Sequence, residues 1–77
     1  MNKYTESVIL PHLLALKIIH NKGKRSYKSI YKECIRIVNI KDINYMKTYY
    51  ITKNLLQMKY KYIIVSINPI KIKKVID

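Results

Sequence analysis

Residues 59–77, KYKYIIVSINPIKIKKVID, constrain the fold more than any other part of the chain. The two apolar runs in this segment, both dotted with lysine and separated by Asn68-Pro69, predict two strands joined by a turn. A two-stranded hairpin alone is marginally stable in water at best. Residues 1–58 must therefore build an apolar surface on which the hairpin packs.

The turn of this hairpin decides which of its side chains face the core. Pro69 cannot adopt the positive φ of a type I′ turn, so we expect the four-residue loop Ile67–Ile70. The corresponding register pairs Val65 with Ile72 and Ile63 with Lys74. The face expected to meet the core then carries Ile63, Val65, Ile67, Ile70, Ile72 and Ile76. The outer, lysine-edged face carries Tyr62, Ile64, Ser66, Lys71, Lys73 and Val75.

Three helices are expected before the hairpin, because apolar residues recur there at spacings of three and four. The first covers residues 10–22, with Pro11 in its first turn and Gly23 as the left-handed residue after its end. The second covers 27–38, capped by Ser26 or Ser29, and the third covers 42–58, capped by Asp42. Residues 1–9 are an N-terminal extension, which is helical if Thr5 or Ser7 caps an earlier start.

The second and third helices each have two distinct faces. In the second, the core face holds Ile30, Tyr31, Cys34, Ile37 and Val38, opposite a stripe of Lys28, Lys32 and Arg36. In the third, the core side holds Asn44, Thr48, Ile51, Leu55 and Met58, with Thr52 and Leu56 beside them. Its other side holds Met46, Tyr49, Tyr50, Lys53 and Gln57, with Asn54 at the edge. This outer side is aromatic and polar with little charge.

The chain has a formal net charge of +12 in 77 residues, which is unusual for one small domain. So much self-repulsion costs stability, and an anionic partner relieves it. Most of the basic residues lie in residues 24–41 and 59–77, whereas residues 42–58 hold only Lys47 and Lys53 against Asp42. The third helix is thus nearly neutral and lies between two basic flanks.

The order of three helices and a hairpin resembles a winged helix-turn-helix domain, most similar to the small winged-helix proteins of archaea, their plasmids and their viruses. The resemblance rests on SIYKECIRIV, on DINYMKTYYITKNLLQMKY as the recognition helix and on YIIVSINPIKIKKVI as the wing. Lys24-Arg25-Ser26 stands at the place of the short first strand. The chain departs from the family where many members keep a glycine before the wing, because Lys59 or Lys61 stands there.

The resemblance implies an α+β winged-helix fold over residues 1–77 and binding of double-stranded DNA, with the wing in residues 60–76. Candidate residues in the major groove are Met46, Lys47, Tyr49, Tyr50, Lys53 and Asn54. Candidate phosphate contacts are Lys24, Arg25, Lys28, Ser29, Lys71 and Lys73. In such an arrangement the flanking lysines would bind phosphates, and the less charged helix would contact the base edges.

Three interpretations of the basic surface compete. The first is a sequence-specific DNA-binding regulator, expected to be a homodimer through the N-terminal segment and the first helix. The second is a winged-helix protein–protein adaptor whose lysines serve only solubility. The third, a membrane-surface peptide, is disfavoured because the apolar residues are better used as a core, and the apolar run at residues 8–19 is too short to span a bilayer.

Other function classes lack the residues they need. His12, His20 and Cys34 do not have the paired spacing of metal ligands. Four scattered carboxylates offer no acid–base pair, and no glycine-rich loop is present to hold phosphates. We therefore expect no enzyme, no metal, no cofactor and no small-molecule substrate. With a single cysteine and no visible signal peptide, we expect a cytoplasmic, DNA-associated protein.

Overall fold

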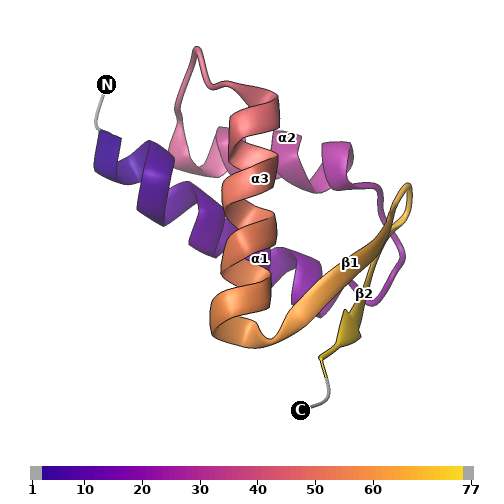
Figure 1. The fold of residues 1–77 in the computed structure, drawn as a ribbon. Coiled ribbons are helices and arrows are strands. Elements are labelled where there is room, and N and C mark those ends of the chain that lie inside the picture. Colours follow the sequence, from indigo (N-terminus) through magenta and orange to yellow (C-terminus); the bar gives the residue numbers. More distant parts are fainter. Residues whose placement is uncertain (1–2, 76–77) are drawn as a thin grey trace.

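The computed structural model describes residues 3–75, in which three helices precede an antiparallel hairpin (Figure 1). The elements are α1 (Leu10–Asn21), α2 (Tyr27–Val38), α3 (Tyr45–Leu55), β1 (Tyr62–Ile67) and β2 (Ile70–Lys74). Two wider π-helical turns, η1 (Thr5–Ile9) and η2 (Leu56–Tyr60), extend α1 backwards and α3 forwards. The predicted α+β fold class is confirmed, and the layout is consistent with a winged helix.

The helices end on residues in the left-handed conformation. Lys22 follows α1 with φ of 57°, Asn39 follows α2 with φ of 54°, and Lys61 follows η2 with φ of 63°. Gly23 also has a positive φ, of 72°, and a Cβ there would lie 3.3 Å from Cγ of Lys71. Lys61, one of the two lysines expected at the place of the glycine before the wing, adopts a left-handed backbone conformation that favours glycine.

The third helix differs from the predicted range 42–58. It begins at Tyr45, because the Asn44 side chain accepts a hydrogen bond from the Lys47 amide (2.9 Å) and caps the helix. Asp42, the predicted cap, lies in the preceding loop with φ of 59°. The helix also continues to Tyr60 through η2.

Ten residues of α1, α2, η2 and β2 form the apolar core: Leu10, Leu14, Ala15, Ile18, Tyr27, Ile30, Tyr31, Cys34, Leu56 and Ile70. Several residues predicted on the core faces of the helices lie outside it, among them Asn44, Ile37 and Met58, which are exposed. Ile37, in the last turn of α2, is 55% exposed, and Tyr27 at the start of that helix is buried instead. Met58 is 74% exposed, because the wider turn of η2 rotates the residues after Leu55 away from the α-helical spacing.

The prediction of which β1 side chains face the core is wrong. Ser66 pairs with Lys71 and Ile67 with Ile70, but a bulge at Val65 shifts the rest of the strand by one residue, so that Ile64 pairs with Ile72. A one-residue shift exchanges the two faces of a strand. Ile63 and Val65, expected in the core, are therefore exposed, and Tyr62 and Ile64 are half-buried. Ile67, also expected in the core, is exposed and Ser66 is half-buried, although both keep the predicted register beside the turn. The β2 alternation is as predicted, with Ile70 and Ile72 inward. The connection is the two-residue turn Asn68-Pro69 rather than a four-residue loop.

Tyrosine rings, rather than close approach of the two backbones, join α2 to α3. The ring of Tyr27 lies 5.5 Å from that of Tyr45 and 5.2 Å from that of Tyr49, both edge to face. Tyr31 meets Tyr45 in the same way at 4.7 Å. Edge-to-face pairs add to the energy of burial. The orientation of α3 on α2 thus depends on this cluster.

The inverted face of β1 predicts unequal effects of one substitution at neighbouring positions. Ile64→Thr should lower the free energy of unfolding by about 1–3 kcal/mol, because it places a hydroxyl at a half-buried apolar site. Ile63→Thr keeps the same strand propensity on the exposed face and should change stability by less than about 0.5 kcal/mol. Urea unfolding of both variants decides the matter. Equal losses would contradict the observed register.

Tyr27→Phe should raise the free energy of unfolding by about 1 kcal/mol, because a buried hydroxyl without a partner is costly. Among the buried side-chain polar atoms of residues 3–75, only the Tyr27 hydroxyl makes no hydrogen bond of good geometry, and its contact with the Thr52 hydroxyl, which offsets part of the rise in the Tyr27 pKa caused by burial, is weak. The Thr52 hydroxyl, on the facing side of α3, donates to the Thr48 carbonyl instead (2.8 Å). Thermal unfolding measures the change, with Tyr31→Phe in the same cluster as the control. A Tyr27→Phe protein less stable than the wild type would mean that this hydroxyl has a partner.

Candidate nucleic-acid interface

The outer side of α3 is exposed and chemically unengaged. Met46 and Tyr50 are each 53% exposed, and Lys47, Lys53 and Asn54 are exposed as well. The side chains of Lys47, Lys53 and Asn54 make no hydrogen bond or ion pair with any other described residue. Five of the six candidates for base contacts are therefore exposed on one helix, and the polar groups of three of them, Lys47, Lys53 and Asn54, are free.

Tyr49, the sixth candidate, differs from the others. Its ring is half-buried and packs edge to face on Tyr27 and, at 5.4 Å, on Tyr50. Burial raises the pKa of its phenol, and the neighbouring phenols of Tyr50 and Tyr45 raise it further. Tyr49 thus packs within the tyrosine cluster and also contacts the exposed ring of Tyr50.

The opposite side of α3 is held by two buried threonines. Thr48 and Thr52 are 1% and 0% exposed. Their hydroxyls donate to backbone carbonyls four residues earlier, at 2.9 Å for Thr48 to Asn44 and 2.8 Å for Thr52 to Thr48. Because these short side chains satisfy their own polar atoms, α3 lies close against α1 without a buried unpaired group of its own.

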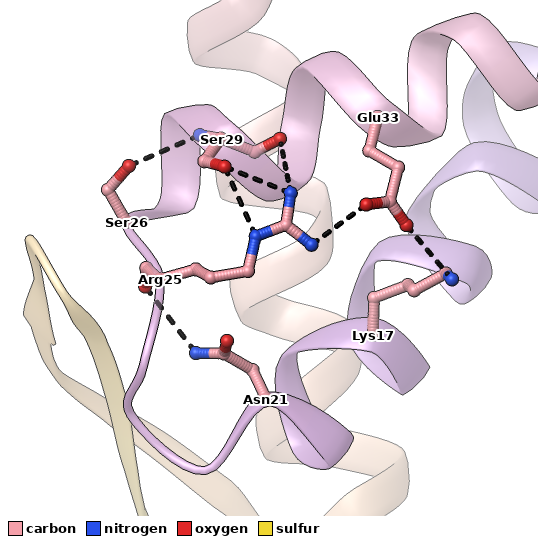
Figure 2. A network of polar contacts seen from close by, with 6 residues as sticks. All are labelled: Lys17, Asn21, Arg25, Ser26, Ser29 and Glu33. Atoms are coloured by element: carbon pink, nitrogen blue, oxygen red, sulfur yellow. Dashed lines mark hydrogen bonds and ion pairs between the residues drawn. The ribbon is translucent and has the colours of Figure 1, made fainter.

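Arg25 and Ser29, both predicted to contact phosphate, are bonded to each other (Figure 2). The Arg25 guanidinium donates to the Ser29 hydroxyl at 2.9 and 3.1 Å and to the Ser29 carbonyl at 3.2 Å. Its remaining arm forms an ion pair with Glu33 at 2.8 Å. These contacts use four of the five N–H groups of the guanidinium, so only one N–H, on Nη1, is left for a phosphate.

The contacts of Arg25 extend to α1 and β2. Glu33 also binds Lys17 of α1, with Nζ and Oε2 3.0 Å apart. The backbone carbonyl of Arg25 accepts hydrogen bonds from the Ile70 amide (2.7 Å) and the Asn21 side chain (3.4 Å). Residues 24–26 form no strand. The hydrogen bond from the Ile70 amide to the Arg25 carbonyl nevertheless lies where the short first strand expected from the resemblance would pair with β2. We call the connected set of Lys17, Asn21, Arg25, Ser29, Glu33 and the Ile70 amide the Arg25 network.

The remaining candidates on this flank are free. Lys24 and Lys28 are exposed, as are Lys32 and Arg36 further along α2. A shallow hollow of about 460 Å³ runs beside them and is lined by Arg25, Ser26, Lys28, Ser29, Lys32, Glu33 and Arg36. Lys32 and Arg36 were not among the predicted phosphate contacts, although their spacing of four residues from Lys28 is the signal that identifies them.

The wing presents lysines beside exposed apolar side chains. Lys71 and Lys73 are exposed on β2, and Lys73 lies opposite Ile63 of β1. The stem of Lys71 lies against Gly23, which anchors the side chain while its ammonium stays in solvent. Lys74, in contrast, donates to the Tyr60 carbonyl (3.2 Å) and lies 4.6 Å over the Tyr62 ring.

The structure assembles no other chemical site within residues 3–75. In that range no three His, Cys, Asp or Glu side chains come together in a way that could hold a metal ion. Cys34 is fully buried, and burial raises the pKa of its thiol to about 11, which makes it a poor nucleophile. None of the helices in this part of the chain is long and apolar enough to cross a membrane.

Comparisons with known proteins give no family for this chain. No protein-family model, no curated protein and no solved structure matches it. Its function must therefore be inferred from the residues and the geometry described above.

The Arg25 network makes a pH-dependent contribution to stability. Hydrogen bonds from Lys17 and then from Arg25 hold the pKa of Glu33 below its ordinary value of 4.5. The stabilisation is therefore complete above that value and is lost as the pH falls through the lower folded-state pKa. Glu33→Gln should lower the Tm at neutral pH, and the difference from the wild type should vanish in acid.

Thermal unfolding followed by circular dichroism between about pH 7 and pH 2 tests this dependence. Asp42→Asn, an exposed carboxylate outside the network, is the matched control and should follow the wild type throughout. A Glu33→Gln deficit that persists at low pH would assign the effect to packing of the side chain rather than to its charge.

Proposed function

We propose that this chain is a sequence-specific double-stranded DNA-binding protein that acts as a transcriptional regulator, with α3 in the major groove. The observation that carries the proposal is the outer face of α3. This face exposes Met46 and Tyr50 beside Lys47, Lys53 and Asn54, and the side chains of these last three have no hydrogen-bond or ion-pair partner among the described residues. A surface evolved only for solubility has no need to expose a large apolar and an aromatic side chain among such free polar groups.

The chemistry of this face suits base recognition. The major groove admits an α-helix, and each base pair presents a distinct pattern of donors and acceptors there. Asn54 offers a donor and an acceptor one residue from Lys53, which suits the edges of adenine and guanine. Tyr50 and Met46 offer apolar surface to thymine methyl groups, and the Tyr50 hydroxyl can bind a phosphate.

Within this proposal the basic residues have two different roles. Lys24, Lys28, Lys71 and Lys73 grip phosphates and carry the sequence-independent part of the affinity. Arg25 and Ser29 instead hold the loop before α2 and the start of β2 in place, because most of their polar atoms are already used in contacts within the chain. In this proposal Arg25 and Ser29 therefore stabilise the fold beside the DNA instead of serving mainly as phosphate contacts.

A protein–protein adaptor is the second candidate, and one observation favours it. The outer face of the wing exposes Ile63 (42%), Val65 (56%) and Ile67 (51%) beside its lysines. Contiguous exposed apolar side chains often mark a binding surface for another protein. An adaptor would use the wing and leave α3 without a partner.

Substitutions on α3 separate the two functions. Lys53→Ala and Asn54→Ala should each weaken binding to the preferred duplex by about 1–3 kcal/mol and hardly change binding to random duplex. Both side chains are exposed and unengaged, so the fold should not suffer. Fluorescence anisotropy titrations with both duplexes give the affinities, after selection of the preferred site from a random pool.

Lys28→Ala and Lys73→Ala are the matched controls for sequence reading. Each substitution should weaken binding to the preferred and the random duplex by the same factor. It should also reduce the slope of log K against log salt by about 0.9, the value for one phosphate that is no longer neutralised. Equal weakening on both duplexes for Asn54→Ala would mean that α3 grips only the backbone. No binding of any duplex would remove the DNA proposal and leave the adaptor.

A further inference from the structure

The side of α2 that points away from α3 carries basic side chains that have no role in the function proposed above. Tyr27 and Tyr31 are the α2 residues whose rings meet α3. At about 100° per residue, Lys32 and Arg36 lie about 120° and 160° around the helix from the midpoint between these two tyrosines. Figure 2 shows α2 from this side, with α3 behind it. Lys32 and Arg36 therefore face away from the outer side of α3.

The hollow beside α2 has a strongly basic lining. Its volume is about 460 Å³, and every residue that lines it has a charged or a hydroxyl side chain. Four of these residues are basic, and the carboxylate among them, that of Glu33, is already paired with Lys17 and Arg25. Lys32 and Arg36 are exposed and form no hydrogen bond or ion pair with another residue among 3–75. Two full positive charges are thus free on this side, next to the remaining N–H of Arg25.

The chemistry of this hollow selects the backbone of a nucleic acid as its occupant. Arg, Lys and Ser side chains commonly bind phosphate oxygens. A protein partner needs apolar or aromatic side chains at the centre of the contact, and a membrane surface needs apolar side chains that insert. The described residues that line the hollow include neither kind. The spacing also fits, because Lys28, Lys32 and Arg36 cover about 12 Å of the helix, which corresponds to about three to four nucleotides of one strand.

We infer that the side of α2 formed by Arg25, Lys32 and Arg36 binds the phosphates of a second duplex while the outer side of α3 holds the first. The inference rests on the proposed function for the first duplex and adds the bridging of two duplexes as an activity. A helix with its side chains is about 10–12 Å across, so a straight duplex on α3 does not reach the far side of α2. Lys28 lies between the two sides and stays with the first duplex. Because the second contact depends on charge, it has no sequence preference.

A pull-down between two duplexes tests the bridging. The preferred duplex is fixed to beads, and a random duplex with a fluorescent label stays on the beads only if the protein binds both. The wild type should retain the labelled duplex at about 50 mM salt, where phosphate contacts are strong. The double variant Lys32→Ala with Arg36→Ala should bind the fixed duplex with unchanged affinity and retain about tenfold less of the labelled duplex. Lys3→Ala with Lys59→Ala, which removes the same charge from exposed lysines outside the hollow, is the matched control and should behave as the wild type.

Titration of the labelled duplex into the complex with the fixed duplex measures the second contact by itself. The double variant should reduce the slope of log K against log salt for this second step by about 1.8, twice the value for one phosphate. Glu33→Gln should act in the opposite direction. It removes the carboxylate that lines the hollow and releases Lys17 and Arg25, so it should strengthen the second step about threefold or more although it lowers the Tm. Far-UV circular dichroism checks that each variant is folded.

The outcomes separate this inference from the proposed function. A wild type that binds the fixed duplex but retains no labelled duplex would overturn the second contact and leave the proposed function intact. Equal weakening of both duplexes by the double variant would place Lys32 and Arg36 in the footprint of the first duplex, and full retention by the double variant would assign bridging to other residues; either result refutes the inference. A wild type that binds no duplex, but binds phosphatidylserine vesicles through Lys32 and Arg36, would overturn both proposals and assign this side of α2 to a membrane surface.

Discussion

The position of the wing depends on one backbone carbonyl, that of Arg25. It accepts the Ile70 amide, and Ile70 is the wing residue that enters the core. The side chain of the same residue binds Ser29 and Glu33, and Glu33 binds Lys17 (Figure 2). One loop residue thus ties α1, α2 and β2 together. Without it, the hairpin would have only its apolar face to fix it on a small core.

The parts of the fold set by neighbours in sequence could be predicted. The range of α2 follows from the Ser26 cap and from apolar residues at steps of three and four. The parts set by distant residues could not. The bulge at Val65 reverses the face of most of β1, and nothing in the alternation of YIIVSI marks it. In the sequence Arg25 has the features of a phosphate contact, and only the fold shows that its guanidinium pairs with Glu33. Of the candidate site, the exposed face of α3 could be predicted from the sequence because its spacing is local.

The packing of α3 shows how a chain without phenylalanine or tryptophan joins two helices. Tyrosine rings fill the space between α2 and α3, and threonines occupy the side of α3 that faces the core. Both residue types carry hydroxyls that need partners, and the threonines find theirs within their own helix. The Tyr27 hydroxyl has only a weak contact with Thr52 and no well-formed hydrogen bond among the described residues. The same rings support Tyr50, so the core and the proposed reading surface share one cluster.

The lysines that end α1 and η2 bear on how such a glycine-poor chain makes its turns. A left-handed backbone costs a residue with a side chain roughly 1–2 kcal/mol. Lys22 and Lys61 adopt it nonetheless, each at the C-terminal end of a helix. A cation there interacts favourably with the negative end of the helix dipole, by about 0.3–1 kcal/mol. The charge thus offsets part of the backbone strain at the same residue. A glycine in either place would relax the backbone, remove that attraction and lower the positive charge of the protein.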